Sequence, residues 1–291
     1  MIKVLKISVY LFILISVFSC APVEIQPPPA PAKIAIVLGA GASKGFAHIG
    51  VLKVIESNNI PVHMIVGTSA GSFVGALYAY GYNAFELQKI SFAIRRDDVI
   101  DLTLPDNGFI KGEKLEVYLN NILRNTPMEK LKIPFYAVST DIQSGNEVVF
   151  GIGNTGTAVR ASCSIPGIFR PVNISGRMYV DGGTVSPVAV DAARRLGADI
   201  VIAVDLSSDV ESSPPRGTIE TILQAINIMY SKLSAIQLSK ADVVIRPKIG
   251  YIGSADFSKR HEAILEGEKA ALDALPKIQE IINSLREEGR L

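Results

Sequence analysis

The chain has 291 residues, of which 48% are hydrophobic and 20% are charged, enough to bury one large core or two smaller ones. Its 29 basic and 28 acidic side chains nearly cancel, so charge supports neither a nucleic-acid partner nor a polybasic membrane surface. A single enzyme-sized globular unit is the expectation that composition leaves.

The first residues have the layout of an export signal. Lys3 and Lys6 precede an apolar run over residues 9–18, which is too short to span a bilayer. We therefore predict a signal peptide over residues 1–19. The proline-rich residues 20–33 that follow are expected to form an extended tether.

The end of this signal, "VFSC", resembles a bacterial lipobox in which Cys20 becomes the lipidated first residue of the mature protein. The resemblance implies an exported lipoprotein anchored to a membrane of the bacterial cell envelope. The alternative is a signal peptide that is cleaved without lipidation of Cys20, which would leave the protein secreted or periplasmic.

The next segments alternate between strand and helix patterns. A strand at 33–39 precedes a helix at 46–59, and a strand at 60–67 precedes a helix at 69–81. This alternation predicts an α/β fold, with a mainly parallel sheet between helices. Further strands are expected at 134–141, 147–150, 177–180 and 198–206, and further helices near 84–95, 112–124, 155–162 and 187–196.

A polar, proline-bearing link from about residue 209 separates this main unit, residues 34–208, from a C-terminal extension, residues 209–291. The extension is mostly helical in pattern, with a short strand-like segment at 241–247. We expect it to pack on the flank of the sheet rather than to form an independent domain.

Ser69 lies in the sequence Gly67-Thr68-Ser69-Ala70-Gly71, which has the G-x-S-x-G pattern. A serine on a sharp turn between strand and helix is exposed at the carboxyl edge of a sheet, and glycines two positions away avoid collision with neighbouring backbone. The following helix also presents unpaired N–H groups near the serine. The alternative is an ordinary serine that caps a helix.

The first turn from strand to helix, "LGAGASKG" at 38–45, is a second candidate site. Gly39 and Gly41 fit a dinucleotide-binding turn, but the third glycine is displaced to Gly45 and the second strand ends in no carboxylate. A phosphate-binding loop is also disfavoured, because no G-K-[ST] sequence follows. The remaining interpretation is an oxyanion hole of an acyl-transferring enzyme, next to the turn of Ser69.

A general base for Ser69 has one leading candidate. Asp181 follows the strand at 177–180 and precedes two glycines, an arrangement that allows close approach of a substrate or of Ser69. Asp141 and Asp205 also follow strand-like segments and are alternatives. The three histidines are poorly placed for a triad and too scattered for a zinc site: His48, His63 and His261.

Cys163 is the only cysteine besides Cys20. A disulfide between them would tie the tether to the domain, so none is expected. Cys163 is interpreted as a small buried apolar residue rather than a nucleophile.

Four ordered blocks together resemble the patatin-like phospholipase family, in particular its bacterial branch related to neuropathy target esterase. They are "IAIVLGAGASKGFAHIGVL", "IVGTSAG", "RASCSIPGIF" and "YVDGGTVSPVAVDAARRLGADIVIAVDL". The resemblance covers residues 34 to about 208 and implies a three-layer fold related to α/β hydrolases. It also implies a lipid acyl hydrolase that uses a Ser-Asp dyad, no metal and no cofactor, with membrane lipid as its substrate.

Carried over by position, the resemblance makes Ser69 the nucleophile, Asp181 the general base, and Gly67 and Gly71 the glycines of the elbow. The glycine-rich oxyanion loop falls on Ala40, Gly41, Ala42, Ser43 and Lys44, with alanine at two of the family's glycine positions. Alanine is acceptable there if φ stays negative. Lys44 is expected to orient the loop or to meet an anionic head group.

The altered loop keeps a second function open, that of a catalytically weak lipid-binding or scaffold lipoprotein. A nucleotide-binding protein is disfavoured by the missing carboxylate.

Overall fold

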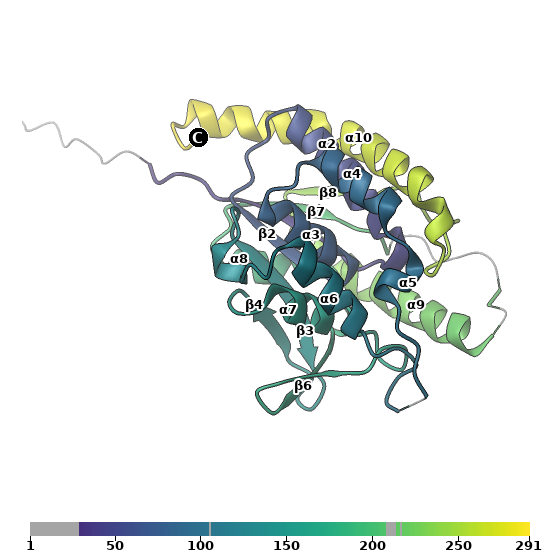
Figure 1. Ribbon diagram of the computed structural model, residues 1–291. Helices are drawn as coiled ribbons and strands as arrows, with labels where there is room; N and C mark the ends of the chain where they lie inside the picture. Colours follow the sequence, from purple (N-terminus) through teal and green to yellow (C-terminus); the bar gives the residue numbers. More distant parts are fainter. Residues whose placement is uncertain (1–28, 105, 208–213, 216) are drawn as a thin grey trace, which may run out of the picture.

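The computed structural model describes residues 29–104, 106–207, 214–215 and 217–291 (Figure 1). The predicted signal peptide, Cys20 and most of the predicted tether lie outside the described residues.

In the described part of the chain, a single eight-stranded sheet forms the centre, with the order β5-β6-β3-β2-β1-β7-β8 and with β4 paired to β3 beside that path. The five strands from β3 to β8 in this order pair in parallel, whereas β4, β5 and β6 pair antiparallel. The strands are β1 (Ile34–Leu38), β2 (Met64–Thr68), β3 (Phe135–Asp141), β4 (Glu147–Phe150), β5 (Val172–Ile174), β6 (Arg177–Asp181), β7 (Ile200–Val204) and β8 (Val243–Ile245).

Helices cover both faces of this sheet, which confirms the predicted three-layer α/β class (Figure 1). The α-helices are α2 (Ala47–Ser57), α3 (Ala70–Tyr80), α4 (Ala84–Ala93), α5 (Arg96–Val99), α6 (Glu113–Ile122), α7 (Thr155–Ser162), α8 (Val190–Arg195), α9 (Thr218–Leu238) and α10 (Arg260–Glu287). Within the described ranges there are also four short 3₁₀ helices: η1 (Ala42–Phe46), η2 (Met128–Lys130), η3 (Gly182–Thr184) and η4 (Phe257–Lys259).

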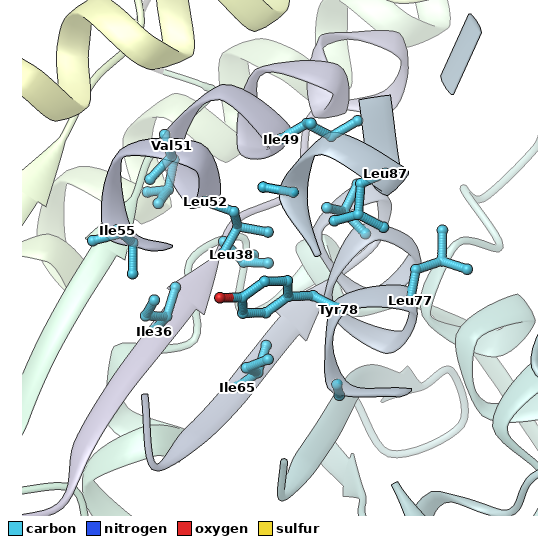
Figure 2. Packing of buried hydrophobic residues seen from close by; sticks show 14 of the residues in the cluster. Ile36, Leu38, Ile49, Val51, Leu52, Ile55, Ile65, Leu77, Tyr78 and Leu87 are labelled. Carbon is cyan, nitrogen blue, oxygen red and sulfur yellow. The ribbon is translucent and has the colours of Figure 1, made fainter. Parts of the chain in front are cut away.

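Strand β1 shows how one short sequence supports two cores. Ile36 and Leu38 belong to the larger core with α2, α3 and α10, while Ala35 and Val37 face a smaller core with α8. Successive side chains of a strand point to opposite faces, so an all-apolar strand is buried on both. In Figure 2, Ile36 and Leu38 lie beneath the side chains of α2.

The C-terminal extension is built into the same sheet. Its strand β8 pairs with β7 as the edge strand, and α10 packs along α2. A Cβ atom at Gly50 would lie 1.9 Å from the Ile264 carbonyl oxygen, and one at Gly267 would lie 2.0 Å from that of Ala47. Glycine on both helices therefore permits their close contact. Among the described helices, none is long and apolar enough to cross a membrane.

Candidate active site

Ser69 lies on a strained turn between β2 and α3. Its φ of 54° and ψ of −124° fall where non-glycine residues are rare. A Cβ atom at Gly71 would lie 2.0 Å from the Leu38 carbonyl oxygen, and one at Gly67 would lie 2.5 Å from the Cα atom of Ser72. Both glycines thus allow the close backbone contacts that hold the turn.

The pairing of β3 brings Asp181 to Ser69. Strand β4 occupies one edge of β3, so β2 and β6 share the other edge end to end. On that edge Thr68 is opposite Val138, and Asp181 is opposite the next residue, Ser139. The end of β2 therefore meets the end of β6, although the two residues are far apart in the chain.

Ser69 and Asp181 form a buried hydrogen-bonded pair. The Ser69 Oγ donates to Asp181 Oδ2 at 2.5 Å, and the Gly183 N–H donates to Asp181 Oδ1 at 2.7 Å. Burial disfavours the charged carboxylate and raises the pKa of Asp181 to about 6, against the opposing effect of these hydrogen bonds. A base with this pKa is ionised at neutral pH and is a stronger proton acceptor than an ordinary aspartate.

Ser162 holds the backbone of the turn. Its Oγ accepts a hydrogen bond from the Ser69 N–H at 2.9 Å and donates one to the Val138 carbonyl oxygen at 2.6 Å. The segment after it also holds Asp181 in place, because the Asp181 N–H donates to the Ser164 carbonyl oxygen at 2.8 Å. This segment therefore makes positioning contacts with both Ser69 and Asp181.

The predicted oxyanion loop is only partly available to a substrate. The N–H groups of Ala40, Ser43 and Lys44 donate to the carbonyl oxygens of Pro187, Ser254 and Gly41, respectively. The prediction that these three residues donate to an oxyanion is therefore wrong. A backbone N–H that is already hydrogen-bonded within the fold is not free to bind an oxyanion. Among the described residues, no backbone partner is found for the N–H groups of Gly41 and Ala42.

Two further details of the loop differ from expectation. Ala42 has a φ of 48°, so the negative φ on which its tolerance depended is absent, and alanine in this region is strained. Lys44 is 2% exposed, which fits a residue that orients the loop and does not fit one that meets a head group at the surface.

Sequence analysis did not assign two further groups at this site. The Ala70 N–H is the first of α3 and directly follows the serine, and no backbone partner is found for it among the described residues. Because the residue after the serine of a G-x-S-x-G pattern commonly donates its N–H to an oxyanion, its position in the sequence could have identified Ala70. Tyr230 on α9 is the second, and nothing in its local sequence marks it.

Tyr230 covers the turn after Asp181. A Cβ atom at Gly183 would lie 2.3 Å from Cζ of the Tyr230 ring, so glycine is what admits the ring there. The buried Tyr230 Oη has no hydrogen-bond partner of standard geometry among the described residues. It lies close enough to Asp181 to contribute to lowering the pKa of that carboxyl.

The histidines and the alternative aspartates lie away from the pair. His48 is fully buried, with Nε2 2.8 Å from the Gly39 carbonyl oxygen, and burial lowers its pKa to about 4. Neutral His48 therefore holds the backbone at Gly39, directly before the predicted oxyanion loop. The other groups bond elsewhere: His63 with the Ile34 N–H, His261 against the Phe92 ring, Asp141 with Arg177, and Asp205 with Ser207 and Arg246.

An apolar cavity of about 250 Å³ opens next to Ser69. Its wall is almost entirely aliphatic and aromatic, with side chains from α3, α4, α5, α6 and α9 and from the segment after α7. Examples from the wall are Phe73, Leu87, Val99, Leu115, Ile165 and Leu223. Such a wall suits a hydrocarbon chain.

Cys163 also lines this cavity. It is a free cysteine, and burial and the nearby Asp181 carboxylate raise the pKa of its thiol. It is therefore a poor nucleophile, as expected from the sequence. Among the described residues, no group of three or more His, Cys, Asp or Glu side chains is arranged to hold a metal ion.

The comparisons with known proteins identify the family of this chain. Residues 36–194 match the family model described as patatin-like phospholipase. The match covers more than half of the chain, and the protein belongs to the patatin-like phospholipase family.

Curated relatives agree with this family. The chain is 30% identical over 290 residues to lysophospholipase NTE1 of Pyricularia oryzae, covering 89% of this chain and 19% of that protein. It is 35% identical over 187 residues to human patatin-like phospholipase domain-containing protein 6, covering 62% of this chain and 14% of that protein. The chain thus spans about a fifth or less of the length of these relatives.

A solved structure shares the fold. The crystal structure of VipD from Legionella pneumophila aligns with a TM-score of 0.51 at 12% identity, over 85% of this chain and 67% of that chain.

Proposed function

We propose that this protein is a serine lipid acyl hydrolase that works through an acyl-enzyme on Ser69, with Asp181 as its general base. The observation that carries the proposal is the 2.5 Å hydrogen bond from Ser69 Oγ to a buried carboxylate, at the end of an apolar cavity. Nucleophile, base and acyl site are therefore adjacent.

In the first half of the reaction, Ser69 Oγ attacks the ester carbonyl carbon and its proton passes to Asp181. The tetrahedral oxyanion accepts hydrogen bonds from the N–H groups of Ala70 and of Gly41 or Ala42. Collapse of this intermediate breaks the ester C–O bond, and the leaving alcohol takes the proton from Asp181. The acyl group is then held on Ser69.

In the second half, Asp181 accepts a proton from a water molecule as the water oxygen attacks the acyl-enzyme. The second tetrahedral intermediate expels Ser69 Oγ, which recovers the proton from Asp181 and releases a free fatty acid. A single carboxylate serves both halves because it is bonded directly to the serine, without an intervening histidine.

The acyl-chain preference follows from the cavity. The cavity wall is lined mainly by apolar side chains. Each methylene of an acyl chain that is buried against it makes binding more favourable by about 0.8 kcal/mol. We therefore expect long-chain acyl esters, such as those of phospholipids and lysophospholipids, to have a higher kcat/KM than short-chain esters of the same alcohol.

A fluorophosphonate probe tests the nucleophile. The wild type should be labelled covalently, the Ser69→Ala variant should not, and the Ser239→Ala variant should be labelled like the wild type, because Ser239 is exposed at the end of α9. Labelling of Ser69→Ala at the wild-type rate would place the nucleophile elsewhere.

The positive φ of Ala42 favours one second candidate, a catalytically weak lipid-binding lipoprotein. In that case the folded wild type would bind lipid vesicles but would show neither fluorophosphonate labelling nor fatty-acid release. Fatty-acid release that depends on Ser69 would exclude it.

The lipoprotein anchor is a separate proposal, supported by the sequence around Cys20. We propose that Cys20 is lipidated and holds the protein on a membrane of the cell envelope. Mass spectrometry of the mature N-terminus should find a diacylglycerol-modified Cys20, and an unmodified start beyond Cys20 would refute the anchor.

A further inference from the structure

Exposed apolar side chains lie at the opening of the cavity beside Ser69 and along the helix that contributes to its wall. Leu102 and Ile219, which line the cavity, are also exposed, and Leu104, two residues after Leu102, is 85% exposed. Met229 and Ile236 are exposed further along α9, beyond the residues of this helix that line the cavity. We propose that these five residues, the apolar rim, are a docking surface for a lipid bilayer; the proposal rests on the lipid hydrolase function proposed above.

Helix α9 carries two apolar surfaces. Its inner residues, Leu223, Ile226 and Tyr230, pack in one cluster with the loops of the site. Met229 and Ile236 are seven residues apart, so they lie on the same stripe of the helix, and they are 54% and 67% exposed. An extensive exposed apolar surface next to a binding site is typical of an interaction surface.

Charge on this helix is sparse. Among its 21 residues only Glu220 and Lys232 are charged. Helices that lie in the plane of a membrane interface insert an apolar surface into the lipid. The exposed side chains of Met229 and Ile236 lie on one stripe of the helix, so docking from one side is the mode that they allow. The lack of a basic cluster on the helix predicts binding that depends little on anionic lipid or on salt.

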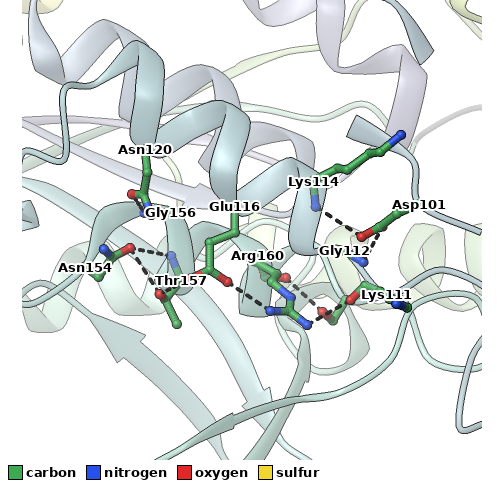
Figure 3. A network of polar contacts seen from close by, with 11 residues as sticks. Asp101, Lys111, Gly112, Lys114, Glu116, Asn120, Asn154, Gly156, Thr157 and Arg160 are labelled. Carbon is green, nitrogen blue, oxygen red and sulfur yellow. Dashed lines mark hydrogen bonds and ion pairs between the residues drawn. The ribbon is translucent and has the colours of Figure 1, made fainter. Parts of the chain in front are cut away.

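Hydrogen bonds hold the segment that leads into Leu102. Asp101 accepts hydrogen bonds from the N–H groups of Gly112 and Lys114, at 2.7 and 3.1 Å (Figure 3). Leu102 forms a bridge with Ile110, and Ile110 packs in the same cluster as the inner face of α9. The loop and the helix are thus held beside each other, with Leu104 directed outward.

A bilayer explains this surface better than a protein partner does, because the surface adjoins the entrance to an apolar cavity. The opening leads through an apolar cavity to Ser69. An acyl chain that moves from a docked bilayer into this cavity stays in apolar surroundings throughout, whereas a chain that crosses water must expose its methylenes. A second copy of the protein on the rim would instead cover the entrance.

Tryptophan fluorescence tests the docking directly, because the chain contains no tryptophan. Single Leu104→Trp and Met229→Trp variants of the full chain should show a blue shift, and quenching by brominated lipid, when phosphatidylcholine vesicles are added. Ile152→Trp is the matched control. Ile152 is 77% exposed and follows β4, which runs antiparallel to β3. Ile152 therefore lies toward the amino ends of the parallel strands, whereas Ser69 follows the carboxyl end of β2.

The fluorescence result decides between the candidate surfaces. Equal shifts at all three positions, or a shift at Ile152→Trp alone, would refute docking through the rim. A shift at Met229→Trp that rises with protein concentration in the absence of lipid would replace the bilayer by a second copy of the chain.

An activity measurement separates docking from catalysis. Leu104→Asp with Met229→Asp should raise the vesicle concentration needed for half-maximal fatty-acid release about tenfold or more, a change of about 1.4 kcal/mol. Neither residue lines the cavity, so hydrolysis of a monomeric short-chain ester should be unchanged. Unchanged activity on vesicles would refute the docking surface. Absence of ester hydrolysis in the wild type would refute the proposed function, while the fluorescence result would still stand on its own.

Discussion

Replacement of Asp181 by asparagine should make the protein more stable as well as inactive. The carboxylate is fully buried, and its pKa in the folded protein is about 6 against an ordinary value of 3.8. At 1.36 kcal/mol per pKa unit, this difference corresponds to about 3 kcal/mol by which the ionised carboxylate destabilises the fold.

The sign of the effect sets its pH dependence. A carboxyl whose pKa is raised by folding binds a proton more readily in the folded state than in the unfolded state. The destabilisation is therefore complete above about pH 6, shrinks between pH 6 and pH 4, and is absent below the pKa of the unfolded chain. Asparagine has a similar shape, stays neutral, and its carbonyl oxygen can still accept the Gly183 N–H.

Urea unfolding of wild type and Asp181→Asn at pH 8 and at pH 4 measures this difference. The variant should have the larger free energy of unfolding at pH 8, by up to about 3 kcal/mol, and the two proteins should converge at pH 4. A variant that is equally or less stable at pH 8 would refute the assignment of a costly buried charge. Fatty-acid release should fall by roughly a thousandfold or more, because the base is lost.

Three further outcomes follow from the same geometry. In the wild type, kcat/KM should rise through an apparent pKa near 6, as Asp181 ionises, and an acid limb below pH 5 would contradict this. Tyr230→Phe removes a buried hydroxyl without a standard hydrogen-bond partner. Because this hydroxyl contributes to lowering the pKa of Asp181, the acid limb of kcat/KM should move to higher pH. An unmoved limb would show that the hydroxyl does not influence Asp181. Ala42→Gly should raise the free energy of unfolding by about 1 kcal/mol, because glycine accepts a φ of 48° without strain. Chemical denaturation of Ala42→Gly beside Ala40→Gly, whose φ is not positive, provides the control.

Periodicity and turn chemistry predicted much of the fold from sequence. Strands such as β1 and β7 are uniformly apolar because both of their faces are buried, and this pattern is visible without coordinates. Strand β5 was not predicted, because it has only three residues and forms a hairpin with β6. Helix α8 begins at Val190 rather than near 187. Pro187 and Val188 lie in the preceding turn, where the Pro187 carbonyl oxygen accepts a hydrogen bond from the Ala40 N–H.

The candidate site was predictable where a short motif fixes local geometry. The glycines around Ser69 and after Asp181 mark tight turns that the sequence displays directly. Partners that come from distant parts of the chain leave no such signal. Tyr230 reaches Gly183 only because α9 crosses the site, and the N–H of Ser43 is bonded by Ser254 of the C-terminal extension. The sign of φ at Ala42 likewise depends on this packing rather than on the residue itself.

The extension has a consequence for the order in which activity arises during synthesis. Ser69 and Asp181 are both translated before α9, β8 and α10, because synthesis proceeds from the N-terminus. A nascent chain that has reached β7 already contains the reactive pair, but it lacks one wall of the acyl cavity and the carbonyl oxygens at Gly253 and Ser254 that secure the oxyanion loop. For the hydrolase proposed above, competence would thus be deferred until the last segments are made, and a truncated product would carry the Ser69–Asp181 pair without a complete acyl cavity.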